Sequence, residues 1–136
     1  MYETFEHTAD LGLRARAADL DTLFAEAARA LFAALVDNPE SVRPTQAVAL
    51  ELNGDDREYL LFDWLKELLY RFEVDHLLFG RFDVKVQPDG LSATAWGEPL
   101  DRGRHELGHE VKAITYHGLT VEQTETGWLA EVIVDI

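Results

Sequence analysis

Two segments of this chain carry apolar residues at the spacing of an α-helix, and they restrict its possible folds more than any other feature. In residues 18–40, one helical stripe is formed by Leu20, Leu23, Phe24, Ala27, Leu31 and Leu35. In residues 55–75, a broader stripe is formed by Leu61, Trp64, Leu65, Leu68, Leu69 and Phe72. Because such stripes must be buried against other elements, both segments are predicted to be helices of a layered fold.

Local signals fix where the first helix begins and ends. Asp19 or Asp21 can accept hydrogen bonds from the free N–H groups of the first turn. Pro39 disfavours helical geometry at Asn38, so the helix is expected to end there. In the second helix, three aromatic residues outside the stripe enlarge the apolar surface: Tyr59, Phe62 and Tyr70. So large an apolar surface predicts that the helix lies at the centre of the fold or offers a face to a partner.

The remaining segments alternate apolar and polar residues with the period of half-buried strands. Strands are predicted at residues 2–6, 11–17, 47–54, 77–87, 91–96, 109–116, 119–126 and 127–136. His117 and Gly118 predict a two-residue hairpin turn. The order of elements predicts an α+β fold with two helices on one side of a largely antiparallel, or mixed, β-sheet. Since the sequence shows no repeat or linker, residues 1–136 are expected to form one domain.

The chain is strongly acidic, with 26 Asp and Glu against 12 Lys and Arg and a net charge of −14. Such a surface repels phosphate backbones, so direct nucleic-acid binding is not expected, whereas cations and basic proteins suit it. Solubility alone also accounts for the charge. Absence of cysteine excludes disulfides and cysteine–zinc sites. No apolar run suits a signal peptide or a membrane span, so a soluble, cytoplasmic protein without membrane association is expected.

The stretch His105–His109 reads HELGH and matches the zinc-protease motif H-E-x-x-H. That motif needs a helix, which brings both histidines to one face. Gly103 precedes the stretch, Gly108 interrupts it, and a strand pattern follows it directly. On a strand the two histidines would be roughly 13 Å apart, too far for one zinc ion. We therefore interpret them as surface loop histidines.

The last strand pattern ends on Asp135 and the carboxylate of Ile136. Its apolar residues predict burial almost to the last residue, and charge at a buried edge is costly without a counter-charge. Mg²⁺ or Ca²⁺ would supply that counter-charge through oxygen ligands. Asp10, in the polar break between the first two strands, is the candidate third ligand. Lys112 is the competing counter-ion. Glu110 and Lys112, two apart on a predicted strand, are expected to share a face, where a surface ion pair between them is the simpler interpretation.

Several longer stretches together resemble the archease family: FEHTADLGLRA, LLFDWLKELLYRF, GEPLDRGRHE, EVKAITYHGLTVE and GWLAEVIVDI. They follow the family's order from Tyr2 to Ile136. One departure is RARAADL, which stands where a glycine-containing stretch is expected before the first helix, and its effect is expected to be local. The resemblance implies a divalent metal ion, such as calcium or magnesium, at Asp10, Asp135 and Ile136. It also implies a functional role for Lys112. His7 and His117 stand at positions that match the sequence pattern of the family.

The resemblance further implies a function in tRNA splicing. Archeases are non-enzymatic activators of the GTP-dependent RNA-splicing ligase, which uses a divalent metal and joins RNA 2′,3′-cyclic phosphate or 3′-phosphate ends to a 5′-hydroxyl. They promote guanylylation of the ligase and let it turn over repeatedly. The resemblance therefore implies the RNA-splicing ligase as the partner. Lys112, His7 and His117 are expected to contact a phosphate or this partner. A nucleotide could also contact the site shared by the two proteins. Two alternatives stay open: a metal-dependent hydrolase and a chaperone-like protein-binding module.

Overall fold

Both segments with helical spacing are helices in the computed structural model, which describes residues 1–7 and 10–136. Helix α1 spans Leu20–Leu35. Asp19 caps its first turn by accepting a hydrogen bond of 2.8 Å from the Thr22 N–H, and this bond lowers the pKa of the Asp19 carboxyl. One of the two predicted caps is thereby confirmed.

Helix α1 ends earlier than the proline signal predicts. Val36 is already extended, with φ −134°, and forms a β-bridge with Leu107. The carbonyls of Ala34 and Leu35 accept hydrogen bonds of 2.8 Å from the His109 and Gly108 N–H groups. A distant loop therefore satisfies the end of the helix, which local sequence signals do not reveal.

Helix α2 spans Arg57–Asp75, as its apolar stripe predicts. The Asp56 carboxylate accepts hydrogen bonds from the N–H groups of Glu58 and Tyr59 at the first turn. The helix ends at His76, which adopts a left-handed conformation with φ 56°.

In the described part of the chain, eight strands form two sheets. The five-stranded sheet contains β1 (Tyr2–His7), β2 (Asp10–Ala17), β8 (Gly127–Asp135), β6 (Ala113–Ile114) and β7 (Thr120–Thr124). The three-stranded sheet has the order β3 (Gln46–Asn53), β5 (Gly90–Pro99), β4 (Leu77–Gln87). A short 3₁₀ helix, η1 (Pro39–Ser41), follows α1. Each strand pairing in the described residues is antiparallel.

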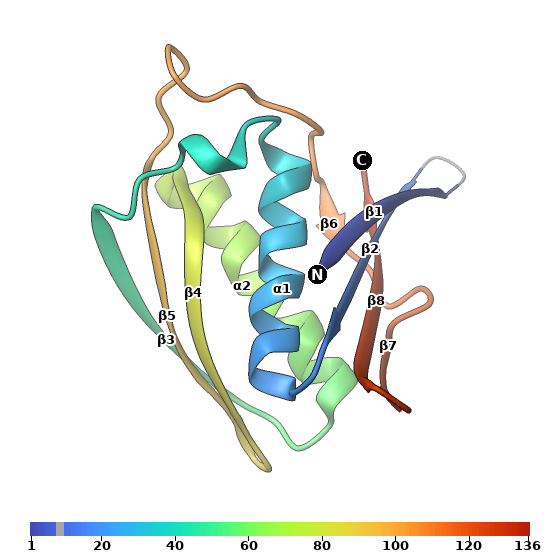
Figure 1. Ribbon diagram of the computed structural model, residues 1–136. Helices are drawn as coiled ribbons and strands as arrows, with labels where there is room; N and C mark the ends of the chain where they lie inside the picture. Colours follow the sequence, from blue (N-terminus) through green and yellow to red (C-terminus); the bar gives the residue numbers. More distant parts are fainter. Residues whose placement is uncertain (8–9) are drawn as a thin grey trace.

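The two helices lie between the two sheets, as Figure 1 shows, and the α+β class is confirmed. The structure differs from the prediction in dividing the strands over two sheets instead of one. The physical reason lies in α1, whose alanines outside the stripe are also buried, among them Ala28, Ala30 and Ala34. A helix buried around so much of its circumference needs cover on more than one side.

Strands β6 and β7 do not form the predicted hairpin. Both pair with β8, in line along the same edge, and the extra residues 115–119 form a loop between them. Gly118 has φ +65°, so the glycine in the turn does adopt the predicted positive φ. The turn therefore interrupts one edge of the sheet instead of joining two adjacent strands.

The core lies between the sheets and centres on fully buried aromatic side chains. The Trp64 side chain of α2 is completely buried, and its indole N–H donates a 3.0 Å hydrogen bond to the Phe24 carbonyl of α1. This bond satisfies a polar group inside the core and ties the two helices together. Among the described residues, no helix has the length and apolar character needed to cross a membrane.

Candidate metal and partner-binding site

The start of β2 and the end of β8 bring two carboxylates together. Asp10 and Asp135 are direct partners in the antiparallel β2–β8 pairing. Direct partners share a face and have Cβ atoms roughly 5 Å apart. Leu11 and Val134 are buried towards the helices, so the two aspartates lie on the opposite face of the sheet. Two like charges in this register repel each other unless a cation lies between them.

The end of β8 is held in place on both sides. On one edge of β8, the Lys112 N–H donates a 2.8 Å hydrogen bond to the Asp135 carbonyl and Ala113 pairs with Asp135. On the other edge, Asp10 of β2 pairs with Asp135. Ile136 is half-buried and packs against the hydrophobic core. The carboxylate of Ile136 is therefore anchored by the side chain of its own residue. Asp135 itself is exposed, so the predicted burial stops one residue before it.

Lys112 lies directly beside this chain end, but not on a strand. Strand β6 comprises only Ala113–Ile114, so the predicted strand from 109 to 116 is mostly irregular. The strand argument that placed Glu110 and Lys112 on one face is therefore wrong. Lys112 is exposed, and its backbone bond to the Asp135 carbonyl places its main chain beside the end of β8.

The two predicted histidines border the same region to different extents. His7 ends β1 opposite Asp10, while its side chain and residues 8–9 lie outside the part of the chain described. His117 is exposed in the 115–119 loop, where its N–H donates to the Thr115 hydroxyl. A Cβ on Gly118 would lie 3.7 Å from Ile133, two residues before Asp135 in β8. The loop therefore reaches towards the aspartate-bearing face.

The end of the sheet fits a hard cation by the chemistry of its donors. Asp10, Asp135 and the terminal carboxylate supply oxygen ligands, which Mg²⁺ and Ca²⁺ prefer. Figure 1 shows the C-terminus near β6, in agreement with the pairing of Asp135 with Ala113 on one edge and Asp10 on the other. Among the described side chains, no three from histidine, aspartate and glutamate form a converging cluster. The proposed set differs, because its third donor is a main-chain carboxylate.

The H-E-x-x-H stretch lies in a loop, and its role differs from that expected. His105 is only 3% exposed, so its interpretation as a surface histidine is wrong, whereas His109 is exposed. The His105 Nδ1 accepts a hydrogen bond from the Asp101 N–H, so its Nε2 carries the proton and donates to Glu98 at 2.9 Å. His105 is therefore a neutral structural residue.

Glu98 is the centre of this buried network. Its carboxylate accepts hydrogen bonds from the Arg104 guanidinium, the Arg43 N–H and His105. The Arg104 bond is the main cause that lowers the pKa of Glu98 to about 2, against the effect of burial. Sequence analysis missed this residue, because its three partners come together only through the fold.

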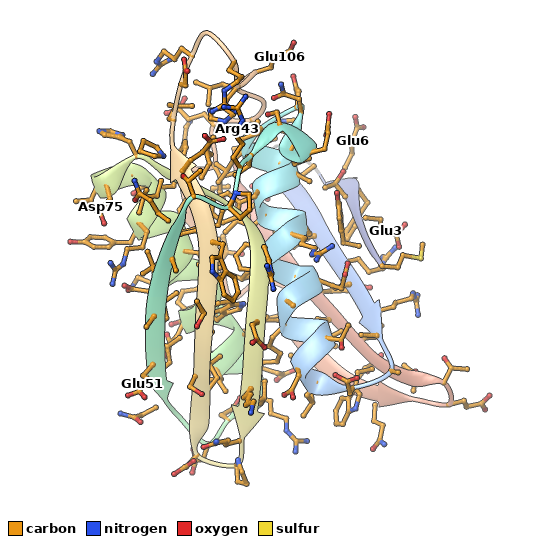
Figure 2. All side chains as sticks on the ribbon, turned by 60° about the vertical axis from the view of Figure 1, so that its left-hand side comes forward. Glu3, Glu6, Arg43, Glu51, Asp75 and Glu106 are labelled. Carbon is orange, nitrogen blue, oxygen red and sulfur yellow. The ribbon has the colours of Figure 1, made fainter. Side chains whose placement is uncertain are left out.

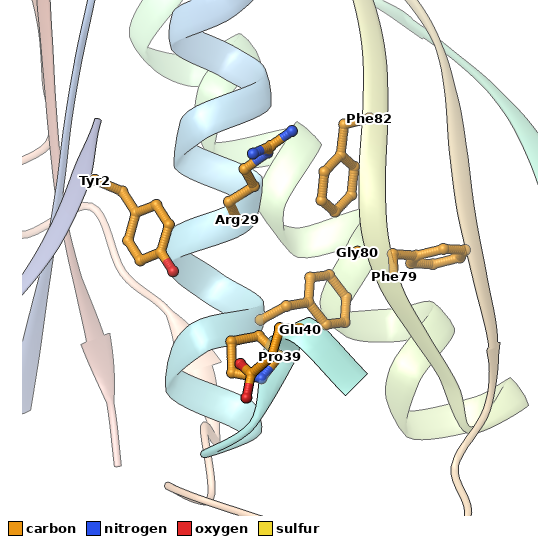
Figure 3. A pocket seen from close by; sticks show the side chains of 8 residues that line it. Tyr2, Arg29, Pro39, Glu40, Phe79, Gly80 and Phe82 are labelled. Atoms are coloured by element: carbon orange, nitrogen blue, oxygen red, sulfur yellow. The ribbon is translucent and has the colours of Figure 1, made fainter. Parts of the chain in front are cut away.

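Elsewhere, the edges of β1 and β4 border a groove of about 230 Å³ beside α1 (Figure 3). Tyr2 and Arg29 line its rim, and its floor is formed by Phe32 and Phe79, which are almost fully buried. None of the predicted site residues lines it. Acidic side chains are spread over the surface instead of gathered there, as Figure 2 shows for Glu3, Glu6, Glu51, Asp75 and Glu106.

Fold and site together define a small, acidic α+β protein with paired carboxylates at a sheet end. Residues 2–136 match the model of the Archease protein family (MTH1598/TM1083). The chain is 42% identical over 139 residues to protein archease of Methanopyrus kandleri, with 99% of each chain covered. It is 41% identical over 140 residues to protein archease of Pyrococcus furiosus, covering 99% of this chain and 98% of the relative.

A solved structure agrees with these relatives. The solution structure of Methanobacterium thermoautotrophicum protein 1598 has a TM-score of 0.87 and 37% sequence identity, covering 99% of this chain and 98% of that one. The chain therefore belongs to the archease family.

Proposed function

We propose that this protein is a non-catalytic, cytoplasmic activator of the GTP-dependent RNA-splicing ligase in tRNA splicing. Family membership supports the choice of partner. The observation that carries the site is the register of β2 and β8, which sets Asp10 directly opposite Asp135. With the carboxylate of Ile136, these residues would hold Mg²⁺ or Ca²⁺.

The cation gives an acidic protein a way to approach phosphates. When bound, it supplies local positive charge on a surface that otherwise carries a net charge of −14. Asp10 and Asp135 orient the site, because both are fixed by strand pairing. Lys112 adds a second positive charge beside it and would contact a phosphate or an acidic group of the ligase. His7 and His117 border the surface that the ligase and its nucleotide would meet.

Metal binding can be tested without the ligase. Asp135→Asn removes one carboxylate of the pair, so Ca²⁺ or Mg²⁺ should no longer raise the thermal unfolding midpoint. The unchanged protein should gain about 5 °C at saturating metal. Asp83→Asn is the matched control, because Asp83 is an exposed strand aspartate in the other sheet. Its variant should keep the full metal-induced shift.

Function is tested by single-turnover and multiple-turnover ligation of RNA with a 3′-phosphate end. Asp10→Asn and Asp135→Asn should abolish repeated turnover and guanylylation stimulation, whereas Asp83→Asn should not. Normal turnover with both site variants would contradict the metal-centred proposal. Phosphoester hydrolysis by the protein alone would instead support a metal-dependent hydrolase.

A further inference from the structure

An exposed group of aromatic rings joins α2 to the 115–119 loop. The Tyr116 ring stacks on Phe62 with centroids 3.9 Å apart and planes 15° apart. Tyr59 meets Tyr116 edge to face, with centroids 5.5 Å apart and an interplanar angle of 79°. We call Tyr59, Phe62 and Tyr116 the aromatic cluster.

The cluster exposes more aromatic surface than the fold requires. Phe62 is only 7% exposed, and stacking of Tyr116 accounts for its cover. Tyr59 and Tyr116 themselves are 58% and 59% exposed, and they lie together. Single exposed apolar residues are ordinary on a protein surface, but adjoining exposed aromatics are a feature of interaction sites. Tyrosine also dominates many protein–protein binding hot spots.

The cluster adjoins the proposed metal site through the loop that carries it. In this loop, the Thr115 N–H and hydroxyl both donate to the Ile133 carbonyl of β8, at 3.1 and 2.8 Å. Gly118, two residues after Tyr116, lies against the Ile133 side chain. Asp135 follows Ile133 on the same face of β8. The loop that carries Tyr116 is therefore fixed to the strand that ends at Asp135.

Charge around the cluster indicates the chemistry of that partner. On α2, Asp63 is exposed and lies one turn after Tyr59, on the same side of the helix. Glu58 lies one turn before Phe62, and its carboxylate accepts a hydrogen bond from the Val121 N–H. One cation, Lys66, lies 5.9 Å from the Phe62 ring centre. Ring faces beside carboxylates favour guanidinium and ammonium groups, which stack on the rings and pair with the acids. A chain of net charge −14 adds long-range attraction for a basic surface.

We propose that the aromatic cluster is the docking surface for a basic face of the RNA-splicing ligase, with partner arginine or lysine side chains on Tyr59 and Tyr116. This inference rests on the proposed function. It fits a partner that must carry positive charge to bind RNA phosphates. Nucleobases also stack on aromatic rings, but the neighbouring carboxylates and the overall charge repel their phosphates.

The test compares ring variants with a tyrosine on the same helix. Binding of the purified ligase is measured by calorimetry for Tyr59→Ala, Tyr116→Ala and their double variant. Tyr70→Ala is the matched control, because Tyr70 is 54% exposed on α2 but lies outside the cluster. We expect the double variant to raise Kd by about tenfold or more and Tyr70→Ala by less than about twofold. Tyr116→Phe keeps the ring and should bind like the unchanged protein.

The outcomes separate this inference from the proposed function. If the unchanged protein stimulates the ligase and the double variant binds it normally, the docking surface is wrong while the function stands. If the unchanged protein neither binds nor stimulates the ligase, both are wrong. If guanosine monophosphate alone binds the unchanged protein and the double variant loses it, the cluster is a nucleotide site and protein docking is overturned. Metal-induced stabilisation of the double variant should remain normal, which confirms its fold.

Discussion

Glu98 shows at the scale of one residue how this fold keeps a buried charge. The residue is 6% exposed, and each of its carboxylate oxygens has a donor from Arg104, His105 or the Arg43 N–H. Glutamine has nearly the same shape, but its NH₂ group would face one of these donors. A buried donor left without an acceptor costs more than the net value of the bond it replaces.

Glu98→Gln is therefore expected to destabilise the protein by about 2 kcal/mol at pH 7. The folded-state pKa of about 2 lies below the ordinary value of 4.5, so the carboxylate stabilises the fold above pH 4.5. That stabilisation is lost as the pH falls from 4.5 towards 2, and the difference between the two proteins should shrink over this range. Urea unfolding at several pH values measures it. Glu51→Gln, at an exposed strand position, is the control. A difference independent of pH would contradict the prediction.

At the scale of elements, the end of β8 is the decisive feature, because one short segment carries both Asp135 and the terminal carboxylate. Ile136 packs on the core, and in the proposed site its carboxylate would join the cross-strand aspartate pair. Residues added after Ile136 would convert its carboxylate into an amide carbonyl and move the terminal charge away. An amide oxygen still binds Ca²⁺, but without a full negative charge.

A C-terminal extension of Gly-Ser-Gly-Ser is accordingly expected to weaken metal affinity by about tenfold or more, with little change in stability without metal. The same extension before Met1 is the control, because the Met1 amino group contacts the Glu26 carboxylate and the Arg16 carbonyl, at the end of the β1–β2 pair opposite to Asp10. Calcium titration followed by calorimetry measures the effect. Equal affinity of the two extended proteins would exclude the terminal carboxylate as a ligand.

The helices and strands also differ in how well local sequence patterns predict them. Both helices follow from 3.6-residue periodicity, and most strands from alternation, since these patterns reflect burial of one face. The irregular structure of residues 109–112 and the in-line arrangement of β6 and β7 depend on contacts with α1 and β8 that local patterns do not encode. The register sets Asp10 opposite Asp135, whereas their role as metal ligands stays a prediction. The contact of Tyr116 with Phe62 was missed, since it joins segments far apart in the chain.

At the scale of the whole molecule, the acidic charge is distributed widely and not confined to the carboxylate pair (Figure 2). Such a field acts over a distance limited by salt, about 10 Å at 0.1 M ionic strength. It accelerates encounter with a basic partner but contributes little once the surfaces are in contact. The aromatic cluster acts only after contact, because dispersion and cation–π interactions are short-ranged.

The two contributions should therefore separate in the kinetics of association with the ligase. Raising NaCl from 50 to 500 mM is expected to lower kon by about tenfold and to change koff by less than about twofold. The double variant, which carries Tyr59→Ala and Tyr116→Ala, should have the opposite effect: koff should rise while kon stays nearly constant. Stopped-flow mixing with fluorescently labelled ligase resolves both rate constants. A kon that does not depend on salt would show that the net charge of −14 serves solubility and not partner encounter.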